Sequence, residues 1–211
     1  MSMVISQLSI SLDGYVAGPE QSRQDPLGRG GLQLHEWVFG LDAWRAQHGL
    51  TGGERNIDAE VVDEMTSDIG AYIMGRRMFG GGDGDWDESW QGWWGDEPPF
   101  RTPVFVLSHH PRTPLVMNGG TEFRFVTDGI ESALRQAREA AGDRRVAIAG
   151  GASTVRQYLA AGLIDTLQLH LVPVILGGGE KLFDGLTSLR LEQVAAVAGP
   201  TVTHVTYRVL R

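Results

Sequence analysis

Residues 145–171, RVAIAGGASTVRQYLAAGLIDTLQLHL, predict the fold class of this chain. The apolar run 145–149 is broken by two glycines, after which Val155 and Leu159 recur at the spacing of one helix face. Beyond Gly162, leucines alternate with polar residues, as they do in a half-buried strand. A strand, a helix and a second strand in this order are typical of an α/β protein with a mainly parallel sheet.

The rest of the chain extends this pattern in both directions. An Asn56 cap begins one expected helix, and Asp128 with Glu131 has capping-box spacing at the start of another, which Gly142 closes. The last two strands are spaced for a hairpin, so we expect the final strand to be antiparallel. Strands are predicted at 3–12, 71–74, 103–107, 123–126, 190–198 and 201–209, and helices at 34–49, 57–69 and 130–141.

The whole chain, 1–211, is predicted to be a single domain with helices on both faces of a twisted sheet. The segment 17–60 is expected to be a variable insertion of loop and helix, and 80–100 is expected to be a Trp- and Gly-rich loop. Between them they hold much of the excess of glycine, 29 residues in 211. Long loops of this kind are usually functional or disordered.

Composition excludes several classes of protein. The chain has no cysteine, which excludes disulfides, cysteine-ligated metal sites and thiol nucleophiles. Its formal charge of -8 argues against nucleic acid as a general partner. It contains no apolar run of about 18 residues, and its first residues do not have the pattern of a signal peptide. We therefore expect no membrane span and a cytoplasmic protein.

Glycine and arginine gather where the predicted strands end. Strand 71–74 leads into Gly75–Arg77, strand 103–107 into Ser108–Arg112, and strand 145–149 into Gly150–Thr154. Ligands of open α/β sheets bind at the carboxyl ends of strands, and a glycine turn before a helix lets the backbone approach a phosphate. Arginine suits phosphate as a bidentate donor. These ends predict a nucleotide site, although neither the Rossmann nor the P-loop motif is present.

Four segments in this order resemble the dihydrofolate-reductase-like superfamily. They are MVISQLSISLDGYVAGPE, YIMGRRMFGG, PVFVLSHHPR and VAIAGGASTVRQYLAAGLID with LHLVPVILGGGEKLF, and they cover well over half of the chain. The chain is most similar to stand-alone relatives of the reductase domain that ends the bifunctional deaminase-reductase of riboflavin biosynthesis. The resemblance implies a dihydrofolate-reductase-like fold, NADPH as the hydride donor and a homodimer.

The resemblance also implies roles for individual residues. Arg76 matches the position nearest the 2′-phosphate, and Asp13–Ala17 match the loop beside the nicotinamide. Gly150 and Gly151 match paired glycines, often joined by a cis peptide, that lie against the cofactor. The residues expected to bind NADPH are Val16, Ala17, Gly75, Arg76, Arg77, Ser108, His109, Arg112, Gly150, Gly151, Ala152, Ser153 and Thr154.

The chain also departs from this family. Without cysteine it lacks the H-x-E and P-C-x-x-C ligands of the zinc deaminase, so no deaminase step is expected. Met78 replaces a frequent threonine, and Asp165 is followed by Thr166, which favours a turn over a catalytic group. The substrate loops differ as well. A pyrimidine or pterin-like ring is the first expectation for the substrate.

Aromatic and acidic residues are candidates for the substrate side. Trp37, Trp90 and Trp93 are expected to contact a planar substrate, and Trp86 and Trp94 are expected to belong to the same aromatic lid. The alternative for the lid is that its indoles pack the loop against the edge of the sheet. The alternative for Trp37 is a place in the core. His170 is expected to alternate outward on its strand and to be a structural residue. Hydride addition also needs a proton. Glu36, on the first helix, is the candidate acid if burial raises its pKa; Asp13 and water are the alternatives.

These observations lead to an NADPH-dependent reductase. The nicotinamide is expected between the 13–17 loop and Gly150–Gly151, facing a pocket bounded by 34–44 and 86–94. The closest analogies are 5-amino-6-(5-phosphoribosylamino)uracil reductase and a dihydrofolate-reductase-like activity. A non-catalytic NADPH-binding protein and a reductase of secondary metabolism remain as alternatives. The apolar stretch 167–176 is expected to form a strand that pairs or packs across a two-fold axis.

Overall fold

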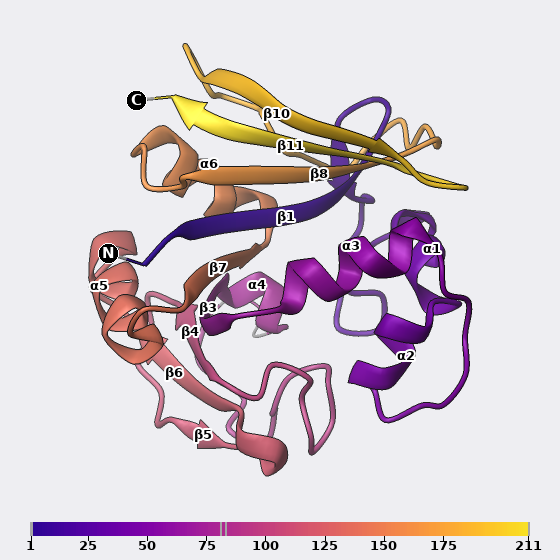
Figure 1. Ribbon diagram of the computed structural model, residues 1–211. Helices are drawn as coiled ribbons and strands as arrows, with labels where there is room; N and C mark the ends of the chain where they lie inside the picture. The colour runs from indigo at the N-terminus through magenta and orange to yellow at the C-terminus, as the bar shows by residue number, and fades with distance from the viewer. Residues whose placement is uncertain (1, 81, 83, 211) are drawn as a thin grey trace. The chain divides into compact units, whose positions relative to one another are not determined.

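The computed structural model describes residues 2–80, 82 and 84–210 (Figure 1). Residues 81 and 83, which fall in the predicted Trp- and Gly-rich loop, lie outside the described residues. The chain groups into two compact units: unit 1 is Met1–Ser6 with Asp68–Asp165, and unit 2 is Gln7–Ser67 with Thr166–Arg211. The strand β1 (Val4–Ser11) contributes residues to both. The prediction of one domain stays a prediction.

Unit 1 is an α/β unit with a mainly parallel sheet. Its strand order is β1-β7-β3-β4-β6-β5, in which every neighbouring pair is parallel except the short edge strand β5. The helix α5 packs on β3 and β4, and α6 packs on β7. Its elements after β1 are β3 (Ile69–Gly75), α4 (Arg76–Phe79), β4 (Pro103–Leu107), β5 (Leu115–Val116), η2 (Asn118–Gly120), β6 (Glu122–Val126), α5 (Ile130–Ala141), β7 (Arg145–Gly150) and α6 (Ala152–Ala160).

Unit 2 is built on the antiparallel strands that end the chain. β8, β11 and β10 lie side by side, drawn in orange to yellow in Figure 1, and β1 follows β8 in the strand order. A separate small sheet pairs β2 with β9. The elements are β2 (Tyr15–Ala17), η1 (Gly31–Leu34), α1 (Glu36–Phe39), α2 (Asp42–Gln47), α3 (Ile57–Thr66), β8 (Thr166–Val172), β9 (Glu180–Lys181), β10 (Arg190–Ala198) and β11 (Thr203–Leu210).

The predicted α/β class, with a mainly parallel sheet and antiparallel C-terminal strands, is confirmed. The buried runs 103–107 and 145–149 are strands because each packs apolar side chains on both faces of a parallel sheet. The amphipathic segment 130–141 is a helix over the predicted residues. None of the described helices is long and apolar enough to cross a membrane.

The predicted helix over 34–49 is wrong, because it is divided into η1, α1 and α2. Leu41 has extended backbone angles and forms a bridge with Glu54. The amide of Asp42 donates to the carbonyl of Glu54, and the amide of Glu54 donates to the carbonyl of Gly40. Pairing with residue 54 takes the backbone of residues 40–42 out of the helical path, and hydropathy spacing does not register such a long-range pair.

Other boundaries were also predicted wrongly. α3 begins at the expected Asn56 cap, whose side chain accepts from the amides of Asp58 and Ala59, but it ends before Ile69, which starts β3. The chain turns between them at Asp68, which has a positive φ of 55°. α5 is capped by Gly129 without a side-chain bond, so the expected capping box does not form.

The strand expected over 167–176 is shorter than predicted. β8 ends at Val172, before Pro173, because proline cannot donate to a ladder. Its partner in the antiparallel sheet is β11 of the same chain. The homodimer therefore remains a prediction that rests on the family resemblance.

Candidate functional site

The carboxyl ends of β3, β4 and β7 lie at one edge of the sheet in unit 1. Met74 is opposite Gly150 in the parallel register, and Gly75 is opposite Leu107. The glycine turns and Ser108, which follow these strands, are therefore brought together as the sequence predicts. The cofactor roles of these residues stay predictions.

Glycine at this edge is required by close packing. A Cβ on Gly75 would collide with Oγ1 of Thr154, whose side chain is buried. Gly150 has a φ of 134°, in the region that favours glycine, and its peptide bond to Gly151 is cis. A Cβ on Gly151 would meet nothing within 4 Å. The backbone at Gly151 thus faces open space just before the N-terminus of α6.

The start of α6 presents two kinds of residue. Ala152 and Thr154 are buried against the unit, whereas Gly151 and Ser153 are exposed. The first amides of a helix carry a partial positive charge and serve as donors to anions. The exposed residues and the backbone of this turn can therefore contact a phosphate, while the side chains of Ala152 and Thr154 shape the turn from within.

Arg76 is held over the indole of Trp86. Its guanidinium carbon is 3.9 Å from the ring centroid, and Nη2 donates to the carbonyl of Asp85 at 3.2 Å. A guanidinium stacked on an indole gains cation–π energy and loses rotamer freedom. The neighbouring Arg77 is exposed. Arg76 is thus oriented by the Trp-rich segment before any ligand binds.

Arg112 is enclosed rather than presented at the edge. Its side chain is fully buried, with Nη2 donating to the carbonyls of Trp90 (2.6 Å) and Glu88 (3.1 Å). Its guanidinium also faces the rings of Phe79, Trp86 and Phe125. These contacts hold the Trp-rich segment, so a phosphate reaches this arginine only if that segment moves.

The turn after β4 is stabilised by its own side chain. Oγ of Ser108 bonds with both the amide and the carbonyl of His110, and that carbonyl also accepts from Nε1 of Trp86. His109 is exposed. The hydroxyl of Ser108 therefore fixes the loop, and the imidazole of His109 is the accessible side chain.

The tryptophans of the 84–94 segment pack into unit 1. Nε1 of Trp90 donates to the carbonyl of Phe79, and Nε1 of Trp93 donates to that of Met78, so both indoles close the end of α4. A Cβ on Gly80 would lie 2.6 Å from the ring of Trp93. Trp86, Trp90 and Trp94 also pack on the core cluster around Phe79. These contacts match the alternative in which the indoles pack the loop against the edge of the sheet. The substrate role of Trp90 and Trp93 stays a prediction.

In unit 2, the loop that begins at Asp13 is tied to the chain beyond β8. The Asp13 carboxylate accepts from the hydroxyl of Ser11 (2.6 Å) and from the amides of Leu176 (3.1 Å) and Gly177 (2.7 Å). The side chains of Val16 and Ala17 are buried in β2. Contact of these two residues with a cofactor would therefore be made through the backbone.

Acidification should release the Asp13 anchor. The hydrogen bond from Ser11, together with those from the two amides, lowers the pKa of Asp13 below its ordinary 3.8. A depressed pKa means that the bonds are complete above pH 3.8 and are lost as the pH falls through the lower folded value. We expect the amide proton shift of Gly177 to titrate with a midpoint below 3.8 in two-dimensional NMR. Asp13→Asn should abolish this titration, and a midpoint above 3.8 would contradict the anchor.

Glu36 is not the buried acid that the sequence predicts. It is exposed at the start of α1, a helix of four residues. Its role as the acid stays a prediction. Trp37, next to Glu36, is half-buried. Its Nε1 donates to Oγ of Ser9, and its ring packs against His170 and His204.

The structure reveals a group of residues that sequence reasoning missed. Asp58, His170 and His204 are buried together in unit 2. The expectation that His170 points outward is wrong, because both faces of β8 are covered at this position. Asp58 follows a helix cap, where an acidic residue is ordinary, so no local signal marked it. Among the described residues, no group of three or more His, Asp or Glu side chains is arranged to hold a metal ion.

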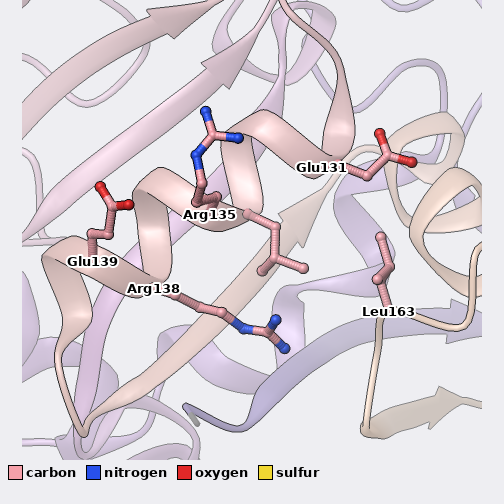
Figure 2. A pocket seen from close by; sticks show the side chains of 6 residues that line it. Glu131, Arg135, Arg138, Glu139 and Leu163 are labelled. Atoms are coloured by element: carbon pink, nitrogen blue, oxygen red, sulfur yellow. The ribbon is translucent and has the colours of Figure 1, made fainter.

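A further pocket lies on α5, among residues not predicted to bind a ligand. Figure 2 shows Arg135, Arg138 and Glu139 on the helix and Leu163 opposite. Glu131 and Leu134 complete the lining. None of the predicted site residues lines this pocket, so it gives no support to the predicted site.

Comparison with solved structures supports the fold. A protein of Shewanella sp. PV-4 ascribed to riboflavin biosynthesis is 23% identical, with 99% of each chain covered and a TM-score of 0.63. Dihydrofolate reductase from Enterococcus faecalis, complexed with NADP(H), is 15% identical, with 98% of this chain and 96% of that one covered and a TM-score of 0.55. The dihydrofolate-reductase-like fold is confirmed.

The chain also matches a bifunctional enzyme in part. The deaminase/5-amino-6-(5-phosphoribosylamino)uracil reductase of Thermotoga maritima is 16% identical with a TM-score of 0.61, and 99% of this chain spans 57% of it. No match was found among curated proteins. The family model of the RibD C-terminal domain matches residues 2–205, nearly the whole sequence. By that match the chain belongs to the family of RibD C-terminal domains.

Proposed function

We propose that this protein is an NADPH-dependent reductase that transfers hydride to a small heterocyclic or carbonyl substrate. The nearest analogies are reduction of 5-amino-6-(5-phosphoribosylamino)uracil and of dihydrofolate. The observation that carries the proposal is the edge of unit 1, where Gly75, Arg76 and Gly150–Gly151 lie at the carboxyl ends of adjacent parallel strands. Membership of the RibD C-terminal domain family supports it.

The residues at this edge fit the phosphates of a dinucleotide. The open space beside Gly151 is the kind of backbone surface that a pyrophosphate approaches, and α6 begins directly after it. Arg76, already oriented by Trp86, offers the planar charge that suits a 2′-phosphate. NADPH would supply the hydride when bound. The protein's part is to bind it, to orient the substrate and to provide a proton.

Nucleotide binding gives the first test. NADPH should raise the melting temperature of the protein, and it should do so more than NADH at equal concentration, because only NADPH carries the 2′-phosphate. At 100 times the dissociation constant, the added stability is about 2.7 kcal/mol. The measurement is a thermal-shift titration with both nucleotides. Equal shifts in melting temperature with NADPH and NADH would contradict recognition of the 2′-phosphate. No shift with either nucleotide would contradict the proposed reductase function.

Turnover distinguishes an enzyme from a binding protein. NADPH oxidation should be followed with the ribosylaminouracil phosphate, dihydrofolate, pterins and quinones as acceptors. The proposal expects NADPH oxidation with at least one of them. Saturable NADPH binding without oxidation by any acceptor would favour the non-catalytic alternative. We also propose a homodimer, which light scattering after gel filtration tests directly.

A further inference from the structure

One tryptophan of unit 1 contacts two of the strand ends that are proposed to bind the cofactor. Trp86 lies in the segment between α4 and β4. Its ring centroid is 3.9 Å from the guanidinium carbon of Arg76, which follows β3. Its Nε1 donates at 2.9 Å to the carbonyl of His110, which follows β4. Trp86 therefore bridges the ends of two neighbouring parallel strands.

The indole of Trp86 is fixed by contacts other than the one with Arg76. The rings of Phe79 and Phe125 meet it edge to face, with centroids 5.9 and 5.0 Å from its own. The guanidinium carbon of Arg112, whose side chain is fully buried, lies 5.1 Å from the indole centroid. The plane of the ring is therefore set by the packing of unit 1, and Arg76 stacks on a surface that is already in place.

Arg76 is held by the same stretch of chain at a second point. Its Nη2 donates at 3.2 Å to the carbonyl of Asp85, the residue before Trp86. The carboxylate of Asp85 lies instead 3.6 Å from Nδ1 of His110. The stack is made with a neutral ring and the hydrogen bond with a neutral carbonyl. Neither of these two contacts brings a negative charge that a phosphate would have to displace.

A guanidinium that is already oriented binds a phosphate more tightly than a mobile one. Arginine has a long, flexible side chain, and its planar donors match a phosphate only in a limited set of directions. Ordering such a side chain during binding weakens the affinity by about 3–10-fold. Stacking on Trp86 orders the side chain of Arg76 before the ligand arrives. Because NADH has no 2′-phosphate, the gain applies to NADPH alone.

We propose that Trp86 determines the specificity for NADPH over NADH, as a positioning residue that acts through Arg76. This inference rests on the proposed NADPH-dependent function. The ligand class is a nucleotide whose adenosine ribose carries a 2′-phosphate. Trp86 does not itself bind the phosphate. Its part is to present the guanidinium of Arg76 in one direction at the edge where β3 and β4 end.

Trp86→Leu is the decisive variant, because it removes the ring on which Arg76 stacks. The dissociation constants of NADPH and NADH are measured by calorimetry with the whole protein, and the ratio of NADH to NADPH gives the preference. We expect Trp86→Leu to lower this preference about 3–10-fold. The dissociation constant of NADH should change by less than about twofold, because NADH makes no contact that depends on the direction of Arg76.

Two milder changes keep a ring at this position. Trp86→Phe retains an aromatic face for the guanidinium but loses the Nε1–H bond, so its preference should lie between those of the wild type and Trp86→Leu. Incorporation of 4,5,6,7-tetrafluorotryptophan in place of Trp86 keeps the shape and the N–H group but withdraws negative charge from the face of the ring. It should lower the preference as Trp86→Leu does, and it replaces that variant if Trp86→Leu does not fold.

A double-mutant cycle shows whether Trp86 acts through Arg76. In the Arg76→Ala protein, Trp86→Leu should have no further effect on the preference, because the group that Trp86 orients is gone. Phe100→Leu is the matched control, since Phe100 is a half-buried ring that packs on the same core cluster around Phe79. It should lower the melting temperature of the protein, as Trp86→Leu does, and leave the preference unchanged.

A spectroscopic measurement reads the stack directly in the ligand-free protein. The ring current of the indole should shift the δ-methylene protons of Arg76 upfield in the NMR spectrum of the wild type. Trp86→Leu should abolish this shift, and Phe100→Leu should retain it. A wild-type protein without the upfield shift would contradict an Arg76 side chain that is ordered before the ligand binds.

The results separate failure of this inference from failure of the proposed function. If the wild type prefers NADPH and a folded Trp86→Leu protein keeps that preference within about twofold, Trp86 is a packing residue and the inference is overturned. An equal loss of preference in Phe100→Leu, or a further loss on adding Trp86→Leu to Arg76→Ala, would also overturn it. If the wild type binds neither nucleotide, or binds both equally, the proposed NADPH-dependent function fails, and the role of Trp86 fails with it.

Discussion

Arg76→Ala should remove the preference of the protein for NADPH over NADH. Loss of the hydrogen bonds from a guanidinium to a phosphate costs about 1.5–3 kcal/mol, which corresponds to roughly 10–150-fold in the dissociation constant. Binding of NADH, which has no 2′-phosphate, should change little. Thermal-shift titration and calorimetry with both nucleotides measure the effect.

The role at the 2′-phosphate is assigned to Arg76 because its guanidinium is already held in place. Its guanidinium stacks on Trp86 and donates to the carbonyl of Asp85, so its direction is set before the cofactor arrives. Arg76→Lys keeps the charge but loses the planar stacking, and it should give an intermediate preference. Arg190→Ala, an exposed arginine on β10, is the control and should bind both nucleotides as the wild type does. A persistent NADPH preference in Arg76→Ala would contradict the assignment.

Phe79→Ala should lower the free energy of unfolding by about 3–5 kcal/mol. Phe79 is fully buried at the end of α4, and its ring meets those of Trp86, Phe123 and Phe125 edge to face. Truncation leaves a cavity beneath the Trp-rich segment and removes one of the three rings that face the Arg112 guanidinium. Urea denaturation followed by tryptophan fluorescence measures the loss.

Two further variants test this explanation. Phe79→Leu refills part of the volume and should cost less than Phe79→Ala. Val116→Ala, at a side chain that is 82% exposed, should change the free energy of unfolding by no more than about 0.5 kcal/mol. A loss below about 1 kcal/mol in Phe79→Ala would mean that the aromatic cluster does not hold the segment.

The elements that sequence predicted well are those whose signal is local. The apolar run 103–107 and the amphipathic run 130–141 have the predicted ends. The glycine turns after β3 and β7 were predicted because a strand end followed by glycine has few other interpretations in an α/β chain. Their proximity follows from parallel pairing, which places all carboxyl ends on one side.

The elements that sequence predicted poorly depend on partners far along the chain. The helix expected over 34–49 is interrupted because residues 40–42 pair with Glu54. The Trp-rich segment gave no periodic signal, and its order comes from indole bonds to the carbonyls of Phe79, Met78 and His110. Arg112 was expected at a phosphate for its residue type, whereas the structure encloses it among aromatic rings.

By itself, the sequence determined the α/β class and the strand ends that carry glycine and arginine, because each depends on residues close together in the chain. It also determined the family resemblance, which rests on the order of four segments. Only the tertiary structure decided which polar side chains are buried together. Asp58, His170 and His204 are separated by 34 to 146 residues, and they meet because α3, β8 and β11 pack in one unit. The hydrogen bonds among these three side chains depend on contacts between residues far apart in the chain, which no local pattern encodes.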